Sequence, residues 1–523
     1  MTNRTPAIIL SLAALALAAC GESDQPAETQ APAAKSIGAL SACGTLIGED
    51  FSDAAEAITT ITEALDVDAT EELPAHCYVL AQIAPETGVE IRLPAQWNGR
   101  LLFTGCGGLC GVIRSEQGDD ALVRGYAVAT TDMGHTTLPE GDRYAFTADP
   151  ELVEDWVHRA THRATLLAKA VIASHYGTPQ DYSYIRGCST GGRQGLTAAL
   201  MYPDDYDGVI AGAPAMEMVS MHNVFAYQAS QRADGTPIFS PAALRTLNDA
   251  VLGACELDDG LDDGVIGDPR ACAFDPASLQ CEEAATEACL TPEQVATAQK
   301  IYAGARDPDG NPYYAMGYAK GTELDWVSGF LGDGDSPPRR AGSTRFILNQ
   351  KIGPQATLAD FDYSVQGVTG SPVGGLLDFG PDGRQLEGFT GQGGKILIYH
   401  GWSDTDAIPA SSLFFQDAQV TAFGADAVPE FLRLFFLPGM RHCRGGPGVD
   451  TVDYLSVMEA WVERGEAPES LAAFRTSASP ASYTPFPLEG EVEAGRMLFP
   501  YPADSEFTGS GDPADPANWR RKN

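Results

Sequence analysis

The stretch "SYIRGCSTGGRQG", residues 183–195, places a serine between glycines where one sequence pattern gives way to another. Before it, "YSYIRG" (182–187) has the composition of a short strand. After it, "GRQGLTAALMYP" (192–203) has the spacing of a helix that stops at its proline. "GCSTG" fits G-x-S-x-G, the turn that presents a nucleophilic serine above a sheet edge. We therefore predict that Ser189 is a nucleophile; the alternative is a glycine-rich turn without chemistry.

Strands and helices alternate on both sides of this turn. Strands are predicted at 125–132, 207–215, 394–401 and 432–439, helices at 154–176 and 450–464, and a hairpin around the "WNG" of 88–105. This order is typical of an α/β fold with a largely parallel sheet. The pattern breaks down in a Gly-, Asp- and Pro-rich region, which we interpret as an inserted lid over the active site. The predicted division is core 41–215, lid 216–390 and core 391–523.

A serine hydroxyl needs a base that accepts its proton. His442 lies in the glycine-flanked loop "LPGMRHCRGG", directly after a strong predicted strand, and we predict it to be that base. His400 is interpreted as a structural residue at a strand end. His222 falls in the insertion and is interpreted as a lid or surface residue.

The base needs a carboxylate that orients it, and the developing oxyanion needs two N–H donors. Asp404 follows the strand at 394–401 and is the predicted acid, with Asp406 as the fallback. One oxyanion donor is the N–H of Thr190. The second is expected from Gly107 or Gly108, in the glycine-rich stretch "FTGCGGLCG".

Two cysteines flank the predicted nucleophile and base. Cys188 directly precedes Ser189, and Cys443 directly follows His442. If the serine and histidine lie within hydrogen-bond distance, the cysteines are also brought close, and a disulfide would keep both groups in register. The alternatives are that Cys188 is a free buried thiol, or that it is itself the nucleophile.

Composition limits the class of protein. The 523-residue chain is 44% hydrophobic and 20% charged, as in soluble globular proteins. Its net charge of −38 repels phosphate backbones, so we expect no nucleic-acid partner. Of the eleven cysteines, those other than Cys20 are even in number, which suits disulfides in an oxidising compartment.

Residues 1–20 have the features of an export signal and end in "LAAC". This ending resembles the lipobox of bacterial lipoproteins, so we expect Cys20 to carry lipid; the alternative is an ordinary secretory signal. Membrane contact is then expected only through this anchor, in the outer membrane or facing the periplasm, because Gly21 rather than aspartate follows the cysteine. Residues 21–40 are predicted to be a disordered tether.

Several stretches together resemble the tannase and feruloyl esterase family. They are "WNGRLLFTGCGG", "GYAVATTDMGH", "YSYIRGCSTGGRQGLTAALMYPDDYDGVIAGAPA", "YHGWSDTDAIP" and "PGMRHCRGGPG". They occur in the family's order over about residues 40–470. The resemblance implies an α/β-hydrolase core with a large inserted lid domain. It also implies a triad of Ser189, Asp404 and His442, with a disulfide between the two flanking cysteines.

The resemblance further implies the disulfides Cys43–Cys77, Cys255–Cys272 and Cys281–Cys289. Cys106 and Cys110 then remain as a fifth pair, which would stiffen the predicted oxyanion loop. This last pair is not typical of the family's glycine-rich loop.

The segment "CELDDGLDDGVIGDPRAC" (255–272) has closely spaced acids separated by glycines. This pattern suits a hard cation with oxygen ligands, calcium above all. The family has a structural calcium loop here, and the positions that match are Glu256, Asp259, the carbonyl of Leu261, Asp263 and the carbonyl of Val265. Aspartate is usual in place of Glu256, whose longer side chain would reshape the site. The alternative is a solvated acidic loop.

The resemblance implies a secreted serine carboxylesterase that acts on small esters of gallate, hydroxycinnamate or terephthalate type. Trp326, Phe330 and Phe346 are candidates to stack on the substrate ring, with core packing as the alternative for each. The arginines at 339, 340 and 345 are candidates to bind a substrate carboxylate, with a solvated turn as the alternative. A different class of function is a catalytically inactive, calcium-stabilised binding protein at the cell surface, against which the complete triad argues.

Overall fold

A nine-stranded sheet forms the centre of the part of the chain that the structure describes. The structure is a computed structural model. It describes residues 36–137, 145–282, 288–332, 386–478 and 490–522, together with residues 1, 338, 340–341, 344, 353, 355–362 and 488. Residues 36–523 form one compact unit. The predicted export signal, Cys20 and most of the tether lie outside the described residues.

The strand order in the sheet is β1-β2-β3-β5-β4-β6-β7-β8-β9. The strands are β1 Thr59–Val67, β2 His76–Ile83, β3 Thr87–Pro94, β4 Arg100–Thr104, β5 Ala127–Thr131, β6 Tyr182–Cys188, β7 Gly208–Gly212, β8 Lys395–Gly401 and β9 Leu432–Leu437. Pairing is antiparallel from β1 to β5 and parallel from β5 to β9. The predicted α/β fold with a largely parallel sheet is confirmed.

The hairpin predicted around "WNG" is wrong. β3 and β4 flank this turn, but β5 lies between them and pairs with both. The local turn chemistry is nevertheless present: the N–H of Arg100 donates to Oδ1 of Asn98 at 2.9 Å, and Gly99 has a φ of 87°. The chain turns at this point, and the two strands then separate by the width of one strand.

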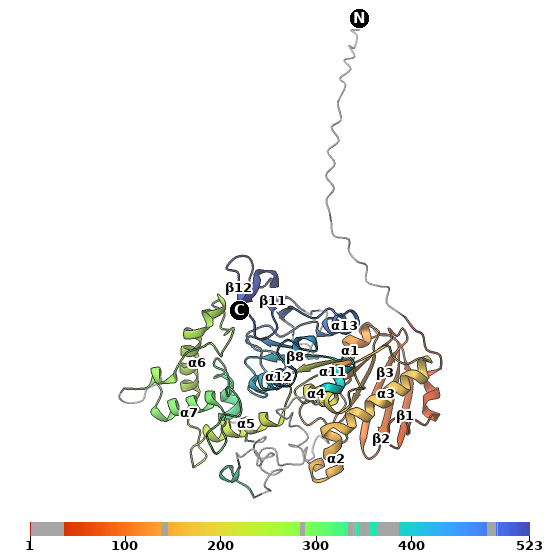
Figure 1. Cartoon of the computed structure of the whole chain (residues 1–523), viewed down its shortest axis with the longest axis horizontal. Helices are drawn as coiled ribbons and strands as arrows, with labels where there is room; N and C mark the ends of the chain where they lie inside the picture. Colours follow the sequence, from red (N-terminus) through yellow and green to blue (C-terminus); the bar gives the residue numbers. More distant parts are fainter. Residues whose placement is uncertain are drawn as a thin grey trace. The chain divides into compact units, whose positions relative to one another are not determined.

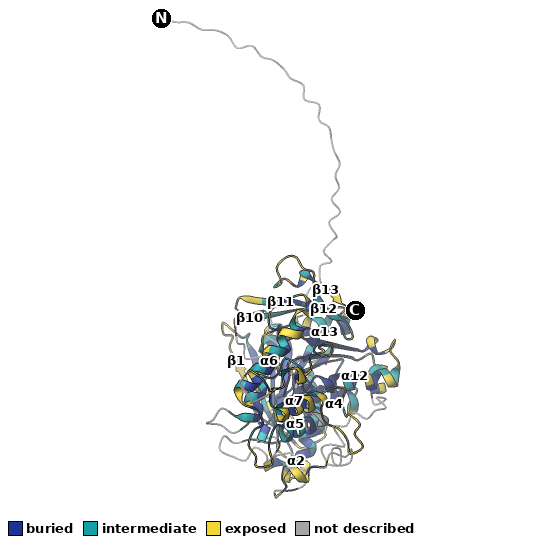
Figure 2. Cartoon of the chain, turned by 90° about the vertical axis from the view of Figure 1, so that its left-hand side faces the viewer, coloured by how far each residue is buried: buried dark blue, intermediate teal, exposed yellow. Residues whose placement is uncertain are grey.

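Helices cover both faces of the sheet (Figure 1). The helices are α1 Asp119–Val123, α2 Pro150–Glu154, α3 Ala160–Tyr176, α4 Thr190–Met201, α5 Glu217–Ala229, α6 Pro241–Cys255, α7 Pro292–Ala303, α11 Glu387–Gly391, α12 Ala410–Phe423 and α13 Tyr454–Arg464. On one face α3, α4 and α12 pack with Ile185 and Val209, and on the other α1 and α13 pack with Tyr184 and Ile210. Adjacent residues of β6 and β7 thus serve opposite faces, as alternating side chains of a strand must. Buried residues fill the interior between these layers (Figure 2).

The predicted insertion leaves the sheet after β7 and returns at β8, its immediate neighbour. Its helices α5, α6 and α7 lie on the left in Figure 1, away from β1–β3 on the right. They enclose a hydrophobic cluster of their own, which includes Leu244, Leu247, Val251, Trp326 and Phe330. Because the insertion begins and ends at adjacent strands, it separates β7 from β8 in the sequence, but the two strands still pair directly in the sheet.

The chain ends in two small two-stranded sheets that sequence reasoning did not anticipate. They are formed by β10 Leu471–Thr476 with β11 Val492–Leu498, and by β12 Asp504–Phe507 with β13 Trp519–Lys522. In Figure 1, β11 and β12 lie beside α6 of the insertion. None of the described helices is sufficiently long and apolar to cross a lipid bilayer.

Candidate active site

The turn that carries Ser189 joins β6 to α4 and has no room for side chains at its glycines. Ser189 has a φ of 61° and a ψ of −120°, a conformation that residues other than glycine rarely adopt. A Cβ atom at Gly187 would lie 2.6 Å from the backbone of Gly191, and one at Gly191 would lie 3.0 Å from the backbone of Gly105. The strained turn leaves Ser189 partly exposed at the carboxyl end of β6.

The predicted oxyanion loop packs against the start of α4. The hydroxyl of Thr190 donates to the carbonyl of Gly108 at 2.6 Å, and the N–H of Cys106 donates to Oε1 of Gln194 at 2.9 Å. Within the described residues, the N–H groups of Gly107 and Gly108 donate to no other protein group. Both predicted donors of this loop are therefore available to an oxyanion.

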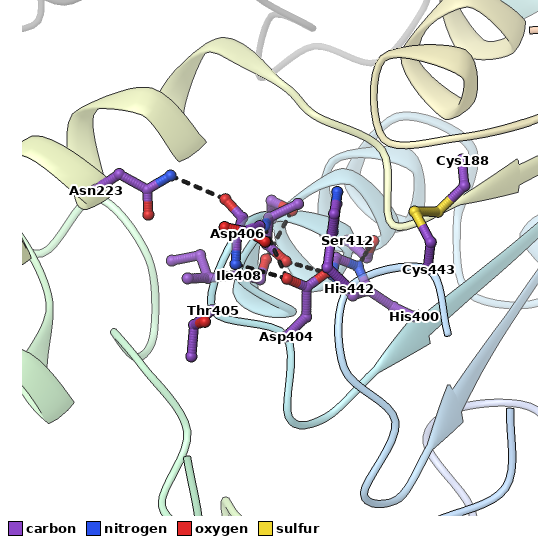
Figure 3. Close-up of polar contacts among 12 residues, drawn as sticks. Cys188, Asn223, His400, Asp404, Thr405, Asp406, Ile408, Ser412, His442 and Cys443 are labelled. Carbon is purple, nitrogen blue, oxygen red and sulfur yellow. Dashed lines mark hydrogen bonds and ion pairs between the residues drawn. A yellow bond between two sulfur atoms is a disulfide. The ribbon is translucent and has the colours of Figure 1, made fainter. Parts of the chain in front are cut away.

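Asp404 and His442 form a short hydrogen bond beside this turn (Figure 3). Nδ1 of His442 lies 2.7 Å from Oδ2 of Asp404, whose side chain is fully buried. The second oxygen of Asp404 accepts the N–H groups of Asp406 at 2.7 Å and of Ala407 at 2.9 Å. The loop after β8 thus fixes the carboxylate, and the carboxylate orients the imidazole.

His400 lies under the same carboxylate in a buried network. Its Nε2 is 2.6 Å from the carbonyl of Ala407 and 3.3 Å from Oδ2 of Asp404. Because a carbonyl can only accept, Nε2 carries the proton, and Nδ1 accepts from the hydroxyl of Ser412 at 2.8 Å. Both ring nitrogens are engaged away from solvent, so His400 supports the loop, as its position at a strand end suggests.

The pKa values of the pair move in opposite directions. Burial alone would raise the pKa of Asp404, but the charge of His442 and the contacts with both histidines hold it well below its ordinary value. Burial alone would lower the pKa of His442, but the charge and hydrogen bond of Asp404 raise it above its ordinary value. The arrangement stabilises a carboxylate–imidazolium pair, which is the state that a histidine base reaches when it accepts a proton.

The disulfide between Cys188 and Cys443 connects this pair to the serine turn (Figure 3). The two Cα atoms lie 5.9 Å apart although 255 positions separate them in the sequence. Ala213 and Ala407 complete a small buried cluster around the sulfur atoms. Among the described residues, no hydrogen bond joins Ser189 to His442; such bonds are often long before substrate binds.

Four further disulfides match the pairs stated above. They are Cys43–Cys77, Cys106–Cys110, Cys255–Cys272 and Cys281–Cys289. The pair at 106 and 110 closes a short turn within the predicted oxyanion loop.

The structure places the candidate aromatic residues in the core of the insertion. Trp326 is 1% exposed and Phe330 is fully buried, and their ring centroids lie 5.9 Å apart. The indole N–H of Trp326 donates to the hydroxyl of Thr322 at 3.1 Å. Neither ring therefore has a free face for a substrate in this arrangement. Phe346 lies outside the described residues, as do the arginines at 339 and 345.

Arg340, considered above for a substrate carboxylate, instead contacts the loop that holds Asp404. Its Nη2 donates to the carbonyl of Thr405 and lies 2.6 Å from Oδ1 of Asp406. Asn223 of α5 donates to the carbonyl of Asp406 at 2.9 Å. The sequence did not predict these contacts from the insertion. Neither Arg340 nor Asn223 stands in a local pattern that indicates a partner so distant in sequence.

A cavity of about 460 Å³ opens beside the imidazole. It is lined by Asp325, Ser328, Thr405, Asp406, Arg441, His442 and Arg444. Nε of Arg441 lies 2.9 Å from Oδ2 of Asp325, so an ion pair spans from the histidine loop to the insertion. All of these lining residues have polar or charged side chains.

The residues of the acidic loop bond mainly to their own backbone. Glu256 accepts the N–H of Gly264 at 3.1 Å, Asp259 that of Leu261 at 3.2 Å, and Asp263 that of Val265 at 3.0 Å. Across the described ranges, no three or more His, Cys, Asp or Glu side chains are grouped so that they could hold a metal ion. Calcium binding stays a prediction.

This chain is similar to known proteins over most of its length. The family model for tannase and feruloyl esterase matches residues 72–338 and 379–521. Mono(2-hydroxyethyl) terephthalate hydrolase of Piscinibacter sakaiensis is 31% identical over 520 residues, 86% of this chain and 85% of that protein. Feruloyl esterase B of Aspergillus niger is 29% identical over 452 residues, 82% of each chain. A solved esterase from Aspergillus oryzae has a TM-score of 0.77 at 25% identity and covers 92% of this chain and 100% of that one.

We expect the double variant Cys188→Ala/Cys443→Ala to keep its fold but to lose about 10- to 100-fold in kcat, because shifts of about 1 Å between reacting groups are costly. The measurement is steady-state ester hydrolysis below the melting temperature of the variant. The matched control, Cys281→Ala/Cys289→Ala, removes a disulfide whose cysteines are only 8 positions apart and should keep the wild-type kcat. Equal kcat values in all three proteins would contradict the role given to Cys188–Cys443.

Proposed function

This chain belongs to the tannase and feruloyl esterase family of carboxylic ester hydrolases, and from that premise we propose that it cleaves esters of aromatic acids through Ser189, His442 and Asp404. The observation that carries the proposal is the arrangement of these groups. A buried carboxylate holds Nδ1 of His442 at 2.7 Å, and a disulfide ties that histidine's neighbour to the residue before a strained serine turn.

In the proposed mechanism, Ser189 Oγ attacks the ester carbonyl while Nε2 of His442 accepts the hydroxyl proton. Asp404 keeps the proton on Nδ1 and stabilises the imidazolium. The N–H of Thr190 and one from Gly107 or Gly108 stabilise the oxyanion. The imidazolium then protonates the leaving alcohol. Water, deprotonated by His442, next hydrolyses the acyl-enzyme to release the acid and restore the serine.

The proposed substrate class follows the relatives. Two of them are named for esters of aromatic acids, a terephthalate monoester in one and a ferulate in the other. We propose residues 216–390 as the lid that contributes specificity, since α5 and Arg340 already contact the loop that holds Asp404. The polar cavity beside His442 is the proposed place of entry for the ester.

We expect purified protein to hydrolyse at least one of methyl gallate, methyl ferulate and mono(2-hydroxyethyl) terephthalate with a kcat/KM about tenfold above that for methyl butyrate. Ser189→Ala should lose at least about 10³-fold in kcat on every substrate. Ser183→Ala is the matched control: it lies on the same strand and is buried, with its hydroxyl donating to the carbonyl of Asp205 at 2.9 Å. It should keep the wild-type kcat.

Two outcomes of this panel separate the parts of the proposal. Faster hydrolysis of methyl butyrate than of all three aromatic esters would refute the substrate class. Retention of more than about a tenth of wild-type activity in folded Ser189→Ala would refute the nucleophile.

We expect kcat/KM to rise with pH through an apparent pKa above about 6.5, because only neutral His442 accepts a proton and Asp404 raises its pKa. In Asp404→Asn the partner charge is lost, so this limb should move to lower pH while kcat falls by about 10³- to 10⁴-fold. The measurement is kcat/KM from pH 5 to 9 for both proteins. An unmoved limb in the variant would show that another group controls it.

We propose that the chain is exported and anchored by lipid on Cys20, which the "LAAC" ending of residues 17–20 supports. In a bacterial host fed a radiolabelled fatty acid, the wild-type protein should become labelled and partition with membranes. Cys20→Ser should remove the label and release the protein from the membrane fraction. A label that persists in Cys20→Ser would contradict lipidation at this residue.

A further inference from the structure

The predicted oxyanion loop is rich in the residue that is hardest to hold in one place. Four of the seven residues 105–111 are glycine. Glycine lets a backbone N–H approach a substrate closely, but it loses more conformational freedom on folding than any other residue. Donors stabilise a developing charge best when their positions are fixed before the reaction. The loop therefore needs constraints that its glycines cannot supply.

Hydrogen bonds fix part of the loop relative to α4. Besides the contact between Thr190 and the carbonyl of Gly108, the carbonyl of Leu109 accepts the indole N–H of Trp156 at 3.1 Å. Arg193 of α4 lies against this indole, with its guanidinium carbon 4.3 Å from the ring centroid. Two successive carbonyl groups of the loop are thus held by α4 or by a ring packed on it, while the N–H groups that face the other way have no such partner.

The disulfide between Cys106 and Cys110 encloses the two predicted donors. Its Cα atoms lie 5.6 Å apart, and the N–H of Cys110 donates to the carbonyl of Gly107 at 3.1 Å inside the closed ring. Cys110 has a φ of 62°, in the left-handed region that disfavours residues other than glycine. A cysteine at this position accepts backbone strain that glycine would avoid, and what it gains is the bond to Cys106.

This disulfide is poorly suited to stabilising the fold as a whole. It joins residues 4 positions apart, whereas the other described disulfides join residues 8, 17, 34 and 255 positions apart. Because the stabilisation by a disulfide grows with the length of chain that it closes, this bond is expected to contribute the least. Its position beside the serine turn is what distinguishes it from the others.

We propose that Cys106 and Cys110 are positioning residues for ester hydrolysis: their disulfide holds the N–H groups of Gly107 and Gly108 where the oxyanion forms. The disulfide itself touches no substrate. Since the donors meet a full negative charge only in the transition state, the bond should act on kcat and leave KM nearly unchanged. This inference rests on the proposed hydrolysis by Ser189, and it goes beyond it by giving a role to a cysteine pair that is not typical of the family.

The first test asks whether the bond is present in the purified protein. Peptide mapping by mass spectrometry without reduction should recover Cys106 and Cys110 linked to each other. Free thiols at both positions in active protein would overturn the proposal.

The second test removes the bond without adding strain. In Cys106→Ala/Cys110→Asn the crosslink is lost, and asparagine tolerates the left-handed conformation of residue 110. We expect kcat for p-nitrophenyl acetate to fall by about 10- to 100-fold, with KM within about twofold of wild type. This substrate makes the measurement independent of the proposed aromatic acyl group.

The matched control is Cys281→Ala/Cys289→Ala, which removes a partly exposed disulfide of the insertion. It opens a longer ring, so it should cost at least as much stability: we expect both variants to melt about 2 to 4 °C below wild type. The control should nevertheless keep the wild-type kcat. A difference in kcat between two variants of similar stability would reflect the place of the bond.

A third measurement locates the loss in the oxyanion site. Sulfur is a weaker hydrogen-bond acceptor than oxygen, so an intact site should favour p-nitrophenyl acetate over its thiono analogue, in which sulfur replaces the carbonyl oxygen. In Cys106→Ala/Cys110→Asn this ratio of kcat/KM values should fall by about tenfold. A misplaced serine or histidine would slow both substrates alike and leave the ratio unchanged.

The outcomes separate the role of this disulfide from the proposed function. A wild-type kcat in Cys106→Ala/Cys110→Asn, or a lower kcat with an unchanged ratio, would overturn the positioning role while the hydrolysis stands. Failure of this variant to fold would also overturn it, because the bond would then support the whole fold. Retained activity in Ser189→Ala would instead refute the proposed nucleophile, and the positioning role with it.

Discussion

The disulfide between Cys188 and Cys443 connects the carboxyl ends of β6 and β9, which have two further strands between them. At a strand spacing of about 4.8 Å, these ends lie about 14 Å apart, so the following loops must converge over β7 and β8. Small side chains make this possible: Ala213 follows β7, Ala407 follows β8, and both pack against the sulfur atoms. The positions of the serine turn and of the histidine loop both depend on this convergence.

The insertion binds directly to the loop of the core that holds the carboxylate of Asp404. Arg340 and Asn223 both bind the backbone of the loop that follows β8, and Asp404 accepts two N–H groups of that same loop. A change in the insertion can therefore reach the imidazole through backbone contacts, without touching a substrate. This explains why the polar cavity beside His442 is lined by residues from both parts.

Patterns within a few residues predicted the serine turn, its flanking strand and helix, and the parallel strands on either side. They failed where distant segments decide the outcome. The turn at Asn98 was recognised, but the placement of β5 between β3 and β4 depends on packing across the whole sheet. The sequence around Trp326 and Phe330 is compatible with rings that line a pocket and with rings that fill a core, and only their burial distinguishes the two roles. Arg496 meets Asp259 from the far end of the chain, and no spacing rule reaches that distance.

The separation of 255 positions between the two bonded cysteines has a consequence for biosynthesis. Cys443 must leave the ribosome before Cys188 can pair with it, so most of the polypeptide exists before the proposed nucleophile and base are connected. Reducing conditions would keep the two thiols apart. Formation of this disulfide during maturation is therefore expected to raise the rate of hydrolysis, by an oxidative step and without proteolytic cleavage.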